Sequence, residues 1–479
     1  MNYGMIIYIL GCVLNFEAVF LLPSCLVAVI YGEQAGWGCF WAVVLCAAVG
    51  TLLTRKKPAN RAIYAREGFV VVALSWVVLS VFGALPFVFS GAIPSMVDAL
   101  FETVSGFTTT GASILSEVES MPKCLLFWRS FTHWIGGMGV LVFVMAVIPL
   151  SGGNSIYLMK AESPGPSVEK LVPNVKKTAF ILYAMYIVIT VIEFVILVIG
   201  KMPVFDSLLL TFGTAGTGGF GTRNDSIGSY TDFQQIVITI FMILFGINFN
   251  AYYFIYRKKW KDAFRMTEVR AYLLIILTAI VLITINTRGM FASLFQTVKH
   301  SAFQVASIIT TTGYSTVDFD LWPAFSKTIL VMLMFIGACA GSTGGGMKVS
   351  RFVIWFKAVV KELDYVIHPR NIRQLSMDGK PIERPTLRSV NVFLFSFVLI
   401  FAFSVLLVSV ENRDVTTNFT AVAATLNNIG PGLSQVGPMG NFGVFSDFSK
   451  MVLIFDMLAG RLELFPMLIL FSPNTWKRQ

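Results

Sequence analysis

The sequence predicts an all-α polytopic membrane protein, and three observations lead to that prediction. Of the 479 residues, 56% are hydrophobic, and the mean hydropathy is +0.75. Charged residues make up 13% of the chain, about half of the share found in soluble domains. Long apolar runs also recur along the whole chain. This composition argues against a disordered chain and against a soluble enzyme, because so much apolar surface needs a lipid environment.

Ten apolar runs are each long enough to cross about 30 Å of hydrocarbon as a helix. They cover residues 4–30, 35–54, 68–90, 124–148, 178–200, 233–256, 270–288, 325–357 (with an interruption), 388–410 and 448–471. The first run lacks a basic segment before it, so we expect a retained span rather than a cleaved signal peptide. Because the number of spans is even, both termini are expected on one side of the membrane.

The basic residues predict which side that is. If the loops alternate across the membrane, 26 of the 36 Lys and Arg residues lie on the side of the termini. They fall in residues 55–67, 160–177, 257–270 and 348–388 and in the C-terminal tail. Because Lys and Arg accumulate in cytoplasmic loops, both termini are predicted to be cytoplasmic. The net charge of +10 is then explained by topology, and no nucleic-acid partner is expected.

The sequence offers few groups for catalysis or for a cofactor. The six cysteines form no CxxC pair, and the three histidines, His133, His300 and His368, are far apart along the chain. Neither pattern is typical of a metal centre built from these residues. No nucleophile and base stand together in a motif, so we predict neither enzymatic activity nor a bound cofactor.

Four loops on the non-cytoplasmic side share one pattern, in which a short apolar segment leads into a glycine-rich turn. These segments cover residues 98–111, 206–218, 301–313 and 418–430, and their final glycines are 107, 95 and 117 residues apart. Span, short segment, turn and span recur in the same order, which indicates a fourfold internal repeat. The first residues, Asp98, Asp206, Ser301 and Asn418, are good helix N-caps, so a helix is predicted to begin at each.

The repeat divides the chain into five predicted parts. Residues 1–67 hold two extra N-terminal transmembrane helices. The four repeats are expected at residues 68–150, 151–257, 258–360 and 361–479.

The four turns suit a cation. Twelve residues of helix span about 18 Å, so each short helix can enter the membrane but cannot cross it. Its carbonyl end favours a cation, and glycine lets successive carbonyls face one axis. Non-helical backbone at this depth is tolerated where it is buried or lines a water-filled path. We therefore predict that the turns surround one central pore and replace the hydration shell of an ion; the alternative is a set of ordinary extracellular turns.

This plan, with the loop sequences TTTGAS, TAGTGGFG, TTTGYS and NNIGPG, resembles the Trk/Ktr/HKT superfamily of potassium transporters over about residues 68–479. The two extra N-terminal spans resemble the Trk-type membrane subunit. In that family the turn residues form the K⁺ filter. The resemblance therefore implies a filter of Thr109, Thr110, Gly111, Gly216, Thr217, Gly218, Thr311, Thr312, Gly313, Asn428, Ile429 and Gly430. Family members that pass sodium tend to carry serine at the first filter glycine, so Gly111 favours potassium.

The eighth span is interrupted by a glycine-rich stretch. Three consecutive glycines cannot sustain a helix in lipid, since each costs about 1 kcal/mol relative to alanine. A phosphate-binding loop is excluded because Met347 stands where that motif requires lysine. A simple packing break remains the alternative. The resemblance implies an intramembrane gate below the filter, formed by Gly341, Ser342, Thr343, Gly344, Gly345, Gly346 and Met347.

A single arginine, Arg461, lies within the last apolar run. A charge inside a span is costly and usually functional. Its neighbours on the same helix face are apolar, so the sequence shows no acidic partner within the span. The alternative is a side chain that extends to the cytoplasmic surface. The resemblance implies that Arg461 faces the pore, resists cation passage and binds gate-loop carbonyls.

Taken together, these features predict potassium uptake across the bacterial cytoplasmic (inner) membrane through a channel-like pore. An ion-coupled secondary transporter, a K⁺/H⁺ or K⁺/Na⁺ symporter, is the alternative. Besides membrane lipid, the resemblance implies two partners, a second copy in a homodimer and a cytosolic ring of nucleotide-binding regulatory subunits. The nine basic residues between positions 348 and 388 could form the docking surface for the ring, although loops that follow the positive-inside rule would look the same.

Overall fold

The structure, a computed structural model, describes residues 1–58, 63–137, 139, 175–370 and 374–477. In this part of the chain, six helices are long and apolar enough to cross a membrane, or seven if one bent pair counts as a single span. The outward faces of these helices are apolar, with Val29, Ile285 and Leu406 exposed by 78%, 70% and 67%. Exposure of this extent suits contact with lipid. The predicted all-helical membrane fold is confirmed.

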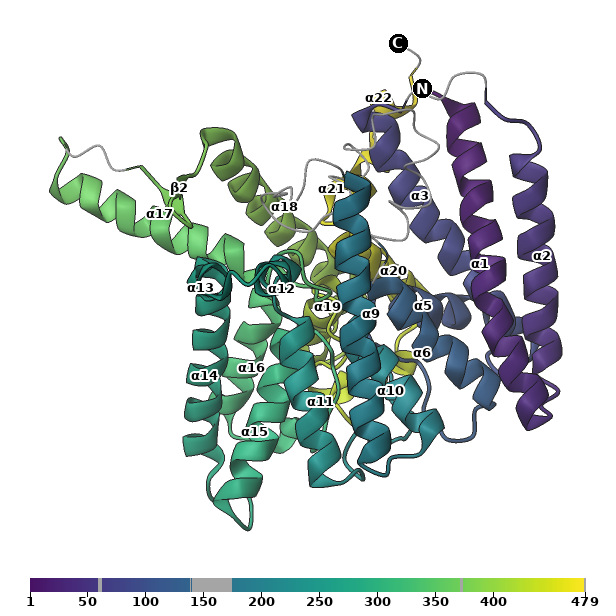
Figure 1. Ribbon diagram of the computed structural model, residues 1–479, viewed down its shortest axis with the longest axis horizontal. Helices are drawn as coiled ribbons and strands as arrows, with labels where there is room; N and C mark the ends of the chain where they lie inside the picture. Colours follow the sequence, from purple (N-terminus) through teal and green to yellow (C-terminus); the bar gives the residue numbers. More distant parts are fainter. Residues whose placement is uncertain (59–62, 138, 140–174, 371–373, 478–479) are drawn as a thin grey trace.

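Helices α1 (Tyr3–Tyr31) and α2 (Gly36–Thr54) form an antiparallel pair at one edge of the molecule (Figure 1). Small residues let their backbones approach closely. A Cβ at Gly11 would lie 2.9 Å from the carbonyl oxygen of Gly50, so larger residues would separate the pair. Both helices agree with the predicted spans to within one residue at each end.

Four units follow, each with an outer helix, a short helix and an inner helix. The outer helices are α3 (Ala65–Gly83), α9 (Val175–Ile199), α14 (Thr267–Thr287) and α18 (Arg384–Val408). The short helices are α5 (Met96–Phe107), α10 (Val204–Gly216), α15 (Leu294–Ile309) and α19 (Val415–Leu426). The inner helices are α6 (Lys123–Gly137), α11 (Asp232–Phe245), α16 (Ala324–Ile336) and α20 (Asp447–Arg461).

The remaining elements lie within, between or after these units. They are the helices α4 (Leu85–Phe89), α12 (Phe249–Tyr256), α13 (Trp260–Arg265), α17 (Val349–Ile367), α21 (Phe465–Leu468) and α22 (Pro473–Trp476). Two two-residue strands, β1 (Ser376–Met377) and β2 (Lys380–Pro381), pair antiparallel. Within the described ranges, 3₁₀ helices lie at Phe319–Leu321, Ser409–Glu411, Ser434–Val436, Phe442–Val444 and Ile469–Phe471.

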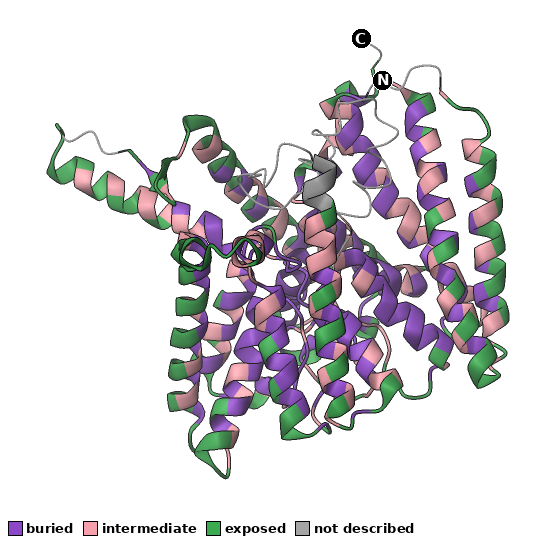
Figure 2. Cartoon of the chain, viewed as in Figure 1, coloured by how far each residue is buried: buried purple, intermediate pink, exposed green. Residues whose placement is uncertain are grey.

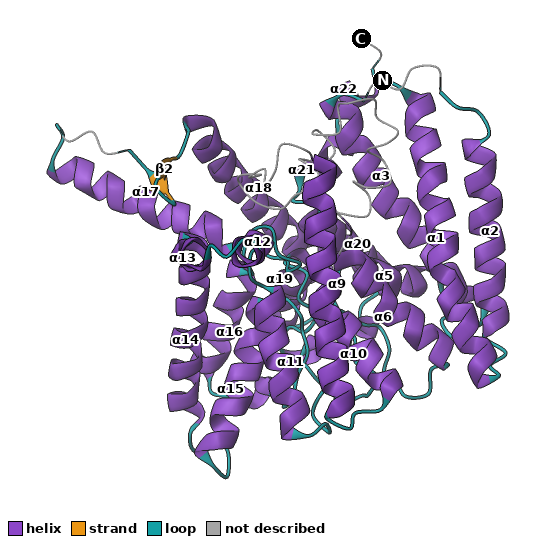
Figure 3. Ribbon diagram, in the orientation of Figure 1, coloured by secondary structure: helices purple, strands orange, loops and turns teal. Residues whose placement is uncertain are grey.

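The four units pack in cyclic order. The inner helix of each unit packs against the short helix of the next, in the pairs α6 with α10, α11 with α15, and α16 with α19. The cycle closes where α20 packs against α5 of the first unit. Buried residues gather at the centre of this arrangement (Figure 2), where the loops that follow the short helices also lie (Figure 3).

The short helices begin earlier than the sequence indicated. Their N-cap residues are Ser95, Pro203, Ser293 and Asp414, so the predicted caps lie inside the helices. The side chains of Ser95, Ser293 and Asp414 each accept a hydrogen bond from the backbone N–H three residues later. One or two amphipathic turns of helix lie between each observed N-cap and the predicted one. A search for apolar runs does not detect these turns, because they are partly polar.

The predicted second spans of units two and four are also corrected, whereas the interruption expected in unit three is present. The helix expected at 233–256 breaks after α11, and α12 continues at 90° to it. The eighth span stops at Ile336 and resumes as α17 at Val349. The last span ends at Arg461, before two residues with left-handed backbone, Glu463 (φ +56°) and Leu464 (φ +69°). The second half of the run 124–148 lies outside the described residues.

Both chain ends lie at the same end of the molecule (Figure 1). The Tyr3 hydroxyl donates a hydrogen bond to the carbonyl oxygen of Trp476, at 2.9 Å. In the same view the β1–β2 pair lies in the upper part of the molecule, and α13 lies lower, at the upper end of α14. Helix α17 projects sideways from the body there.

Candidate ion-binding site

Each short helix ends in a turn with left-handed backbone at two positions. The first position is occupied by Thr109, Thr217, Thr311 and Asn428, whose φ angles are +53°, +54°, +58° and +56°. The second position, two residues later, is occupied by Gly111, Gly219, Gly313 and Gly430, with φ of +80°, +84°, +84° and +98°. Residues that carry a side chain rarely adopt these φ angles, whereas glycine adopts them at little cost. The four turns therefore share one backbone conformation.

This geometry corrects the predicted register of the second turn. We expected Gly216, Thr217 and Gly218 to match Thr109 to Gly111, but the backbone angles place Thr217, Gly218 and Gly219 there. Gly216 is the last residue of α10. Four glycines between positions 216 and 221 made several alignments equally plausible, and the sequence has no signal that separates them. The first, third and fourth turns keep the predicted register.

The turns touch one another in a closed cycle. A Cβ at Gly111 would lie 2.1 Å from the carbonyl oxygen of Gly218, in the second turn. The second and third turns meet the next turn in the same way, with 1.8 Å from Gly219 to Thr312 O and 2.0 Å from Gly313 to Ile429 O. The fourth turn returns to the first, with 2.9 Å from Gly430 to Thr110 O. The four carbonyl oxygens, one from each unit, thus lie in a ring. Each oxygen lies so close to a glycine of the neighbouring turn that a side chain at that glycine would collide with it.

The side chains of the turns are buried and hydrogen-bonded to one another. The hydroxyls of Thr108 and Thr110 lie 2.8 Å apart, and those of Thr310 and Thr312 lie at the same distance. Asn428, in the fourth turn, donates from its amide to the Thr110 hydroxyl at 3.0 Å. This amide therefore links the fourth turn to the first, although the fourth turn lacks the threonines of the others.

The segment 341–347 lies directly against the turns. The N–H of Gly345 donates to the Thr311 hydroxyl at 2.6 Å, and the N–H of Gly346 donates to the carbonyl of Asn427 at 3.0 Å. Both partners belong to the turns of units three and four. The segment is therefore hydrogen-bonded to the predicted ion-binding turns and is more than a break in a helix.

Two residues that the sequence did not single out hold this segment. The carboxylate of Glu268 accepts from the N–H groups of Ala340 and Ser350, at 2.6 and 3.1 Å, which brings its two flanks together. The ammonium group of Lys348 donates to the carbonyl of Gly344. A carboxylate at the start of an apolar span was the only available signal for Glu268, and the same pattern occurs at ordinary helix ends.

Arg461 reaches three parts of the site from the last residue of α20. Its guanidinium donates to the Thr109 hydroxyl at 3.1 Å, to the carbonyl of Thr343 at 2.9 Å and to the carbonyl of Gly136 at 2.6 Å. These contacts direct the side chain to the centre of the molecule, not to the surface near the termini. The nearby carboxylate of Glu463 pairs with Arg351 instead.

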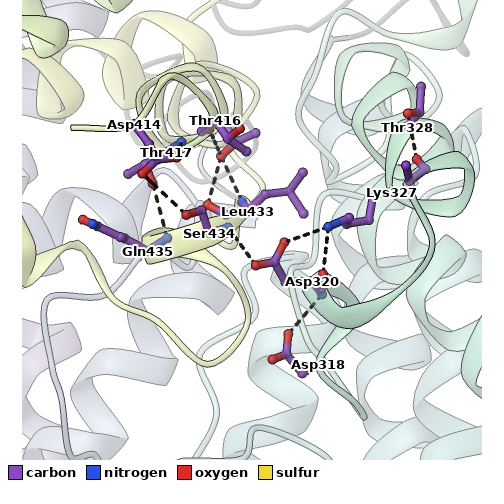
Figure 4. Close-up of polar contacts among 12 residues, drawn as sticks. Asp318, Asp320, Lys327, Thr328, Asp414, Thr416, Thr417, Leu433, Ser434 and Gln435 are labelled. Carbon is purple, nitrogen blue, oxygen red and sulfur yellow. Dashed lines mark hydrogen bonds and ion pairs between the residues drawn. The ribbon is translucent and has the colours of Figure 1, made fainter. Parts of the chain in front are cut away.

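On the far side of the turns, loops of units three and four are joined (Figure 4). Asp320 accepts from the N–H of Ser434 at 3.1 Å and pairs with Lys327 at 3.6 Å. Asp414 caps α19, and hydrogen bonds from Thr417 hold the pKa of its carboxyl below the usual value. These contacts fix the outer ends of the units around the ring.

Comparisons with known proteins show the family and the overall fold of this chain. A family model described as the cation transport protein TrkH matches residues 38–478. The chain is 36% identical to the Trk system potassium uptake protein TrkH of Salmonella typhimurium, over the full length of both. It is 34% identical to the protein TrkG of Escherichia coli K12, over 95% of each chain. The crystal structure of the potassium transporter TrkH from Vibrio parahaemolyticus superimposes with a TM-score of 0.89 at 32% identity, covering both chains completely.

Proposed function

This chain belongs to the TrkH family of cation transport proteins, and from that membership we propose that it takes up potassium through a channel-like pore. The closed cycle of contacts between the four turns carries the proposal. A ring with one carbonyl from each unit offers an ion oxygen ligands in place of water. The filter then consists of Thr109–Gly111, Thr217–Gly219, Thr311–Gly313 and Asn428–Gly430.

The segment 341–347 is the gate of this pore. It is hydrogen-bonded to the turns of units three and four, while Arg461 connects it to the first turn. An ion that has passed the ring would therefore meet the gate and a fixed positive charge next. The positive charge raises the energy of a cation there and favours a closed resting state.

Ion-coupled symport is the second candidate, and one observation favours it. The carboxyl group of Glu193 is fully buried in α9, and a buried carboxyl in a span can carry a proton. Symport with H⁺ or Na⁺ would use the same filter and would add a stoichiometric requirement for the second ion.

Reversal potentials of the purified protein in liposomes distinguish the two candidates. Under separate gradients of K⁺, Na⁺ and H⁺, a channel-like pore gives a potential that follows the K⁺ gradient alone. Symport gives a potential that also shifts with the gradient of the coupled ion. Intact protein that conducts no K⁺ under any gradient contradicts both.

The topology and partners belong to the same proposal. We place the chain in the bacterial cytoplasmic membrane, as a homodimer with both termini cytoplasmic. The basic residues Arg370, Lys380, Arg384 and Arg388 are exposed at the end of the molecule that carries the termini, and they suit the cytosolic nucleotide-binding ring. Two of the nine basic residues between 348 and 388, Lys348 and Arg351, are buried and cannot contribute to that surface.

Charge reversal tests the docking surface. Arg384→Glu combined with Arg388→Glu should abolish co-purification of the ring subunit from native membranes. Arg288→Glu, at the opposite end of the molecule, is the matched control and should leave co-purification unchanged. Equal capture by both variants would place the docking surface elsewhere.

A further inference from the structure

The second filter turn differs from the others in having no side chain at the two positions that flank its left-handed threonine, Thr217. The threonine pairs 108/110 and 310/312 fill this space in the first and third turns. Buried Asn427 and Ile429 hold the same two positions in the fourth turn. The second turn has Gly216 and Gly218 at these positions. Gly218 is outside the left-handed region, so its backbone angle does not explain why the position is glycine.

Helix α6 of the first unit fills the space instead. Arg129, His133 and Gly137 follow one another at intervals of four residues, so they lie on one face of α6. A Cβ at Gly218 would lie 1.7 Å from Nδ1 of His133, so the imidazole already occupies that position. A Cβ at Gly137 would lie 2.6 Å from the Cα of Gly216, which shows how closely α6 approaches the turn.

The neighbours of His133 hold it in this place. Arg129 donates from Nη1 to the carbonyl of Gly221 at 3.2 Å, and its guanidinium lies 3.5 Å from the ring centre of Phe220. The imidazole meets the same ring edge-on, with centroids 4.2 Å apart. Arg129 is itself paired with Glu102 of α5, which belongs to the first unit. The second turn is therefore supported from the helices of the first unit.

The contribution of His133 is one of shape. Its side chain is completely buried, and neither ring nitrogen has a hydrogen-bond partner among the described residues. An unpaired buried polar group is destabilising, so the imidazole does not stabilise the site through hydrogen bonds. What it does provide is a flat, rigid group against the backbone of the turn.

We propose that His133 is a positioning residue for the filter and forms a matched pair with Gly218. The imidazole replaces, from α6, the threonine side chains that brace the first and third turns. It thereby sets the position of the Gly218 carbonyl, which belongs to the ring of four. This inference rests on the proposed function, since its readout is the selectivity of the filter.

The test is a double-variant cycle measured as the ratio of K⁺ to Na⁺ uptake in liposomes. His133→Ala leaves a void behind the turn, and the ratio should fall roughly tenfold, or about 1.4 kcal/mol. Gly218→Thr in the wild-type background should abolish uptake, because the new side chain coincides with the imidazole. The double variant carries the threonine in the vacated space, and its ratio should return to within about threefold of wild type.

Neighbouring glycines provide matched controls in the His133→Ala background. A Cβ at Gly216 would lie 2.2 Å from the backbone oxygen of His133, and one at Gly219 would lie 1.8 Å from the carbonyl oxygen of Thr312. Truncating the imidazole removes neither atom. Gly216→Thr and Gly219→Thr should therefore stay inactive in that background.

Three results would overturn the inference: an unchanged ratio in His133→Ala, normal uptake by Gly218→Thr, or a double variant no better than Gly218→Thr. If Gly218→Thr does not fold, recovery of monodisperse protein in the double variant counts as rescue, and failure to recover it counts against the pair. Wild-type protein without K⁺ preference would instead reject the proposed function.

Discussion

At the scale of single residues, the site depends on glycines that lie too close to neighbouring backbone atoms to carry a side chain. Gly111, Gly219 and Gly313 have left-handed backbone, and each lies against a carbonyl of the next turn. A substitution there meets two separate costs, the strained φ angle and the collision with a backbone oxygen. The two costs can be separated, because other glycines in the chain carry only the first.

Gly111→Ser should lower the K⁺/Na⁺ uptake ratio, because its Cβ would displace the Gly218 carbonyl from the ring. Gly91→Ser is the control, since Gly91 has a similar φ of +73° but no atom within 4 Å of its Cβ position. The control should keep the wild-type ratio. An unchanged ratio in well-folded Gly111→Ser would remove the first turn from the filter.

Arg461→Ala should increase cation flux, and Arg461→Lys should retain much of the barrier. A fixed charge repels a cation by about 4 kcal/mol at 4 Å when the effective dielectric constant is near 20. Lysine keeps this charge but cannot bind Thr109, Thr343 and Gly136 together as the planar guanidinium does. Equal increases in flux would show that tethering of the gate outweighs electrostatics. No change in either variant would exclude Arg461 from the barrier.

At the scale of elements, three inner helices end at irregular backbone near the turns. Helix α11 bends at residues 246–248, α16 gives way to the segment 341–347, and α20 ends at Arg461. The freed backbone groups find partners within the protein. The N–H of Cys339 donates to the carbonyl of Gly246 at 3.1 Å, for example. Non-helical backbone at this depth is stable only with such internal partners.

Deleting Gly344 to Gly346 should raise basal K⁺ flux, because it removes the hydrogen bonds from Gly345 and Gly346 to the turns. Flux is measured in liposomes with protein of wild-type monodispersity. Deleting Gly289 and Met290, both exposed in the loop after α14 at the end opposite the termini, is the control and should leave flux unchanged. Lower or equal flux after the gate deletion would make the segment structural.

Asp414→Ala should lower the stability of the protein by about 1 kcal/mol, the usual loss for an N-cap. Asp414→Asn keeps an acceptor oxygen for the N–H of Thr417 and should lose much less. Because hydrogen bonds from Thr417 lower the pKa of Asp414, this stabilisation is present above the unfolded-state pKa and is lost as the pH falls through the folded-state pKa. Thermal unfolding in detergent measures both effects. Identical unfolding of the two variants would show that the cap is not stabilising.

At the scale of the whole molecule, four units close into a ring while their outer faces remain apolar. The ring closes only because α20 of the last unit packs on α5 of the first. The two ends of the molecule differ, because both termini, α17 and the basic β1–β2 linker lie in the upper part of the view in Figure 1, whereas the loop after α14 lies at the lower end. This distribution agrees with the retention of Lys and Arg on the cytoplasmic side.

Cysteine labelling should place the two ends of the molecule on opposite sides of the membrane. In a background without the six native cysteines, Lys56→Cys should react with a membrane-impermeant maleimide only after the cells are permeabilised. Arg288→Cys should react in intact cells. Both positions are exposed. Labelling of both from outside would overturn the predicted orientation.

Composition and repetition determined much of this protein without a structure. Apolar runs identified the membrane class, and the order of span, short segment and turn identified four units. These properties are readable because burial in lipid imposes length and polarity on each segment separately. In units one, three and four the register expected for the turn agrees with the backbone angles, since each turn ends in a single glycine.

Only the tertiary structure decided the register of the second turn, the ends of the inner helices and the partners of Arg461. Gly219, not Gly218, is equivalent to Gly111, Gly313 and Gly430, because a left-handed φ angle defines that position and residue type alone does not. Thr343 and Gly136 meet Arg461 across more than one hundred residues of sequence. His133 and Gly218 are complementary only because α6 and α10 pack closely. Such contacts arise between units after the ring closes, so no local pattern in the chain records them.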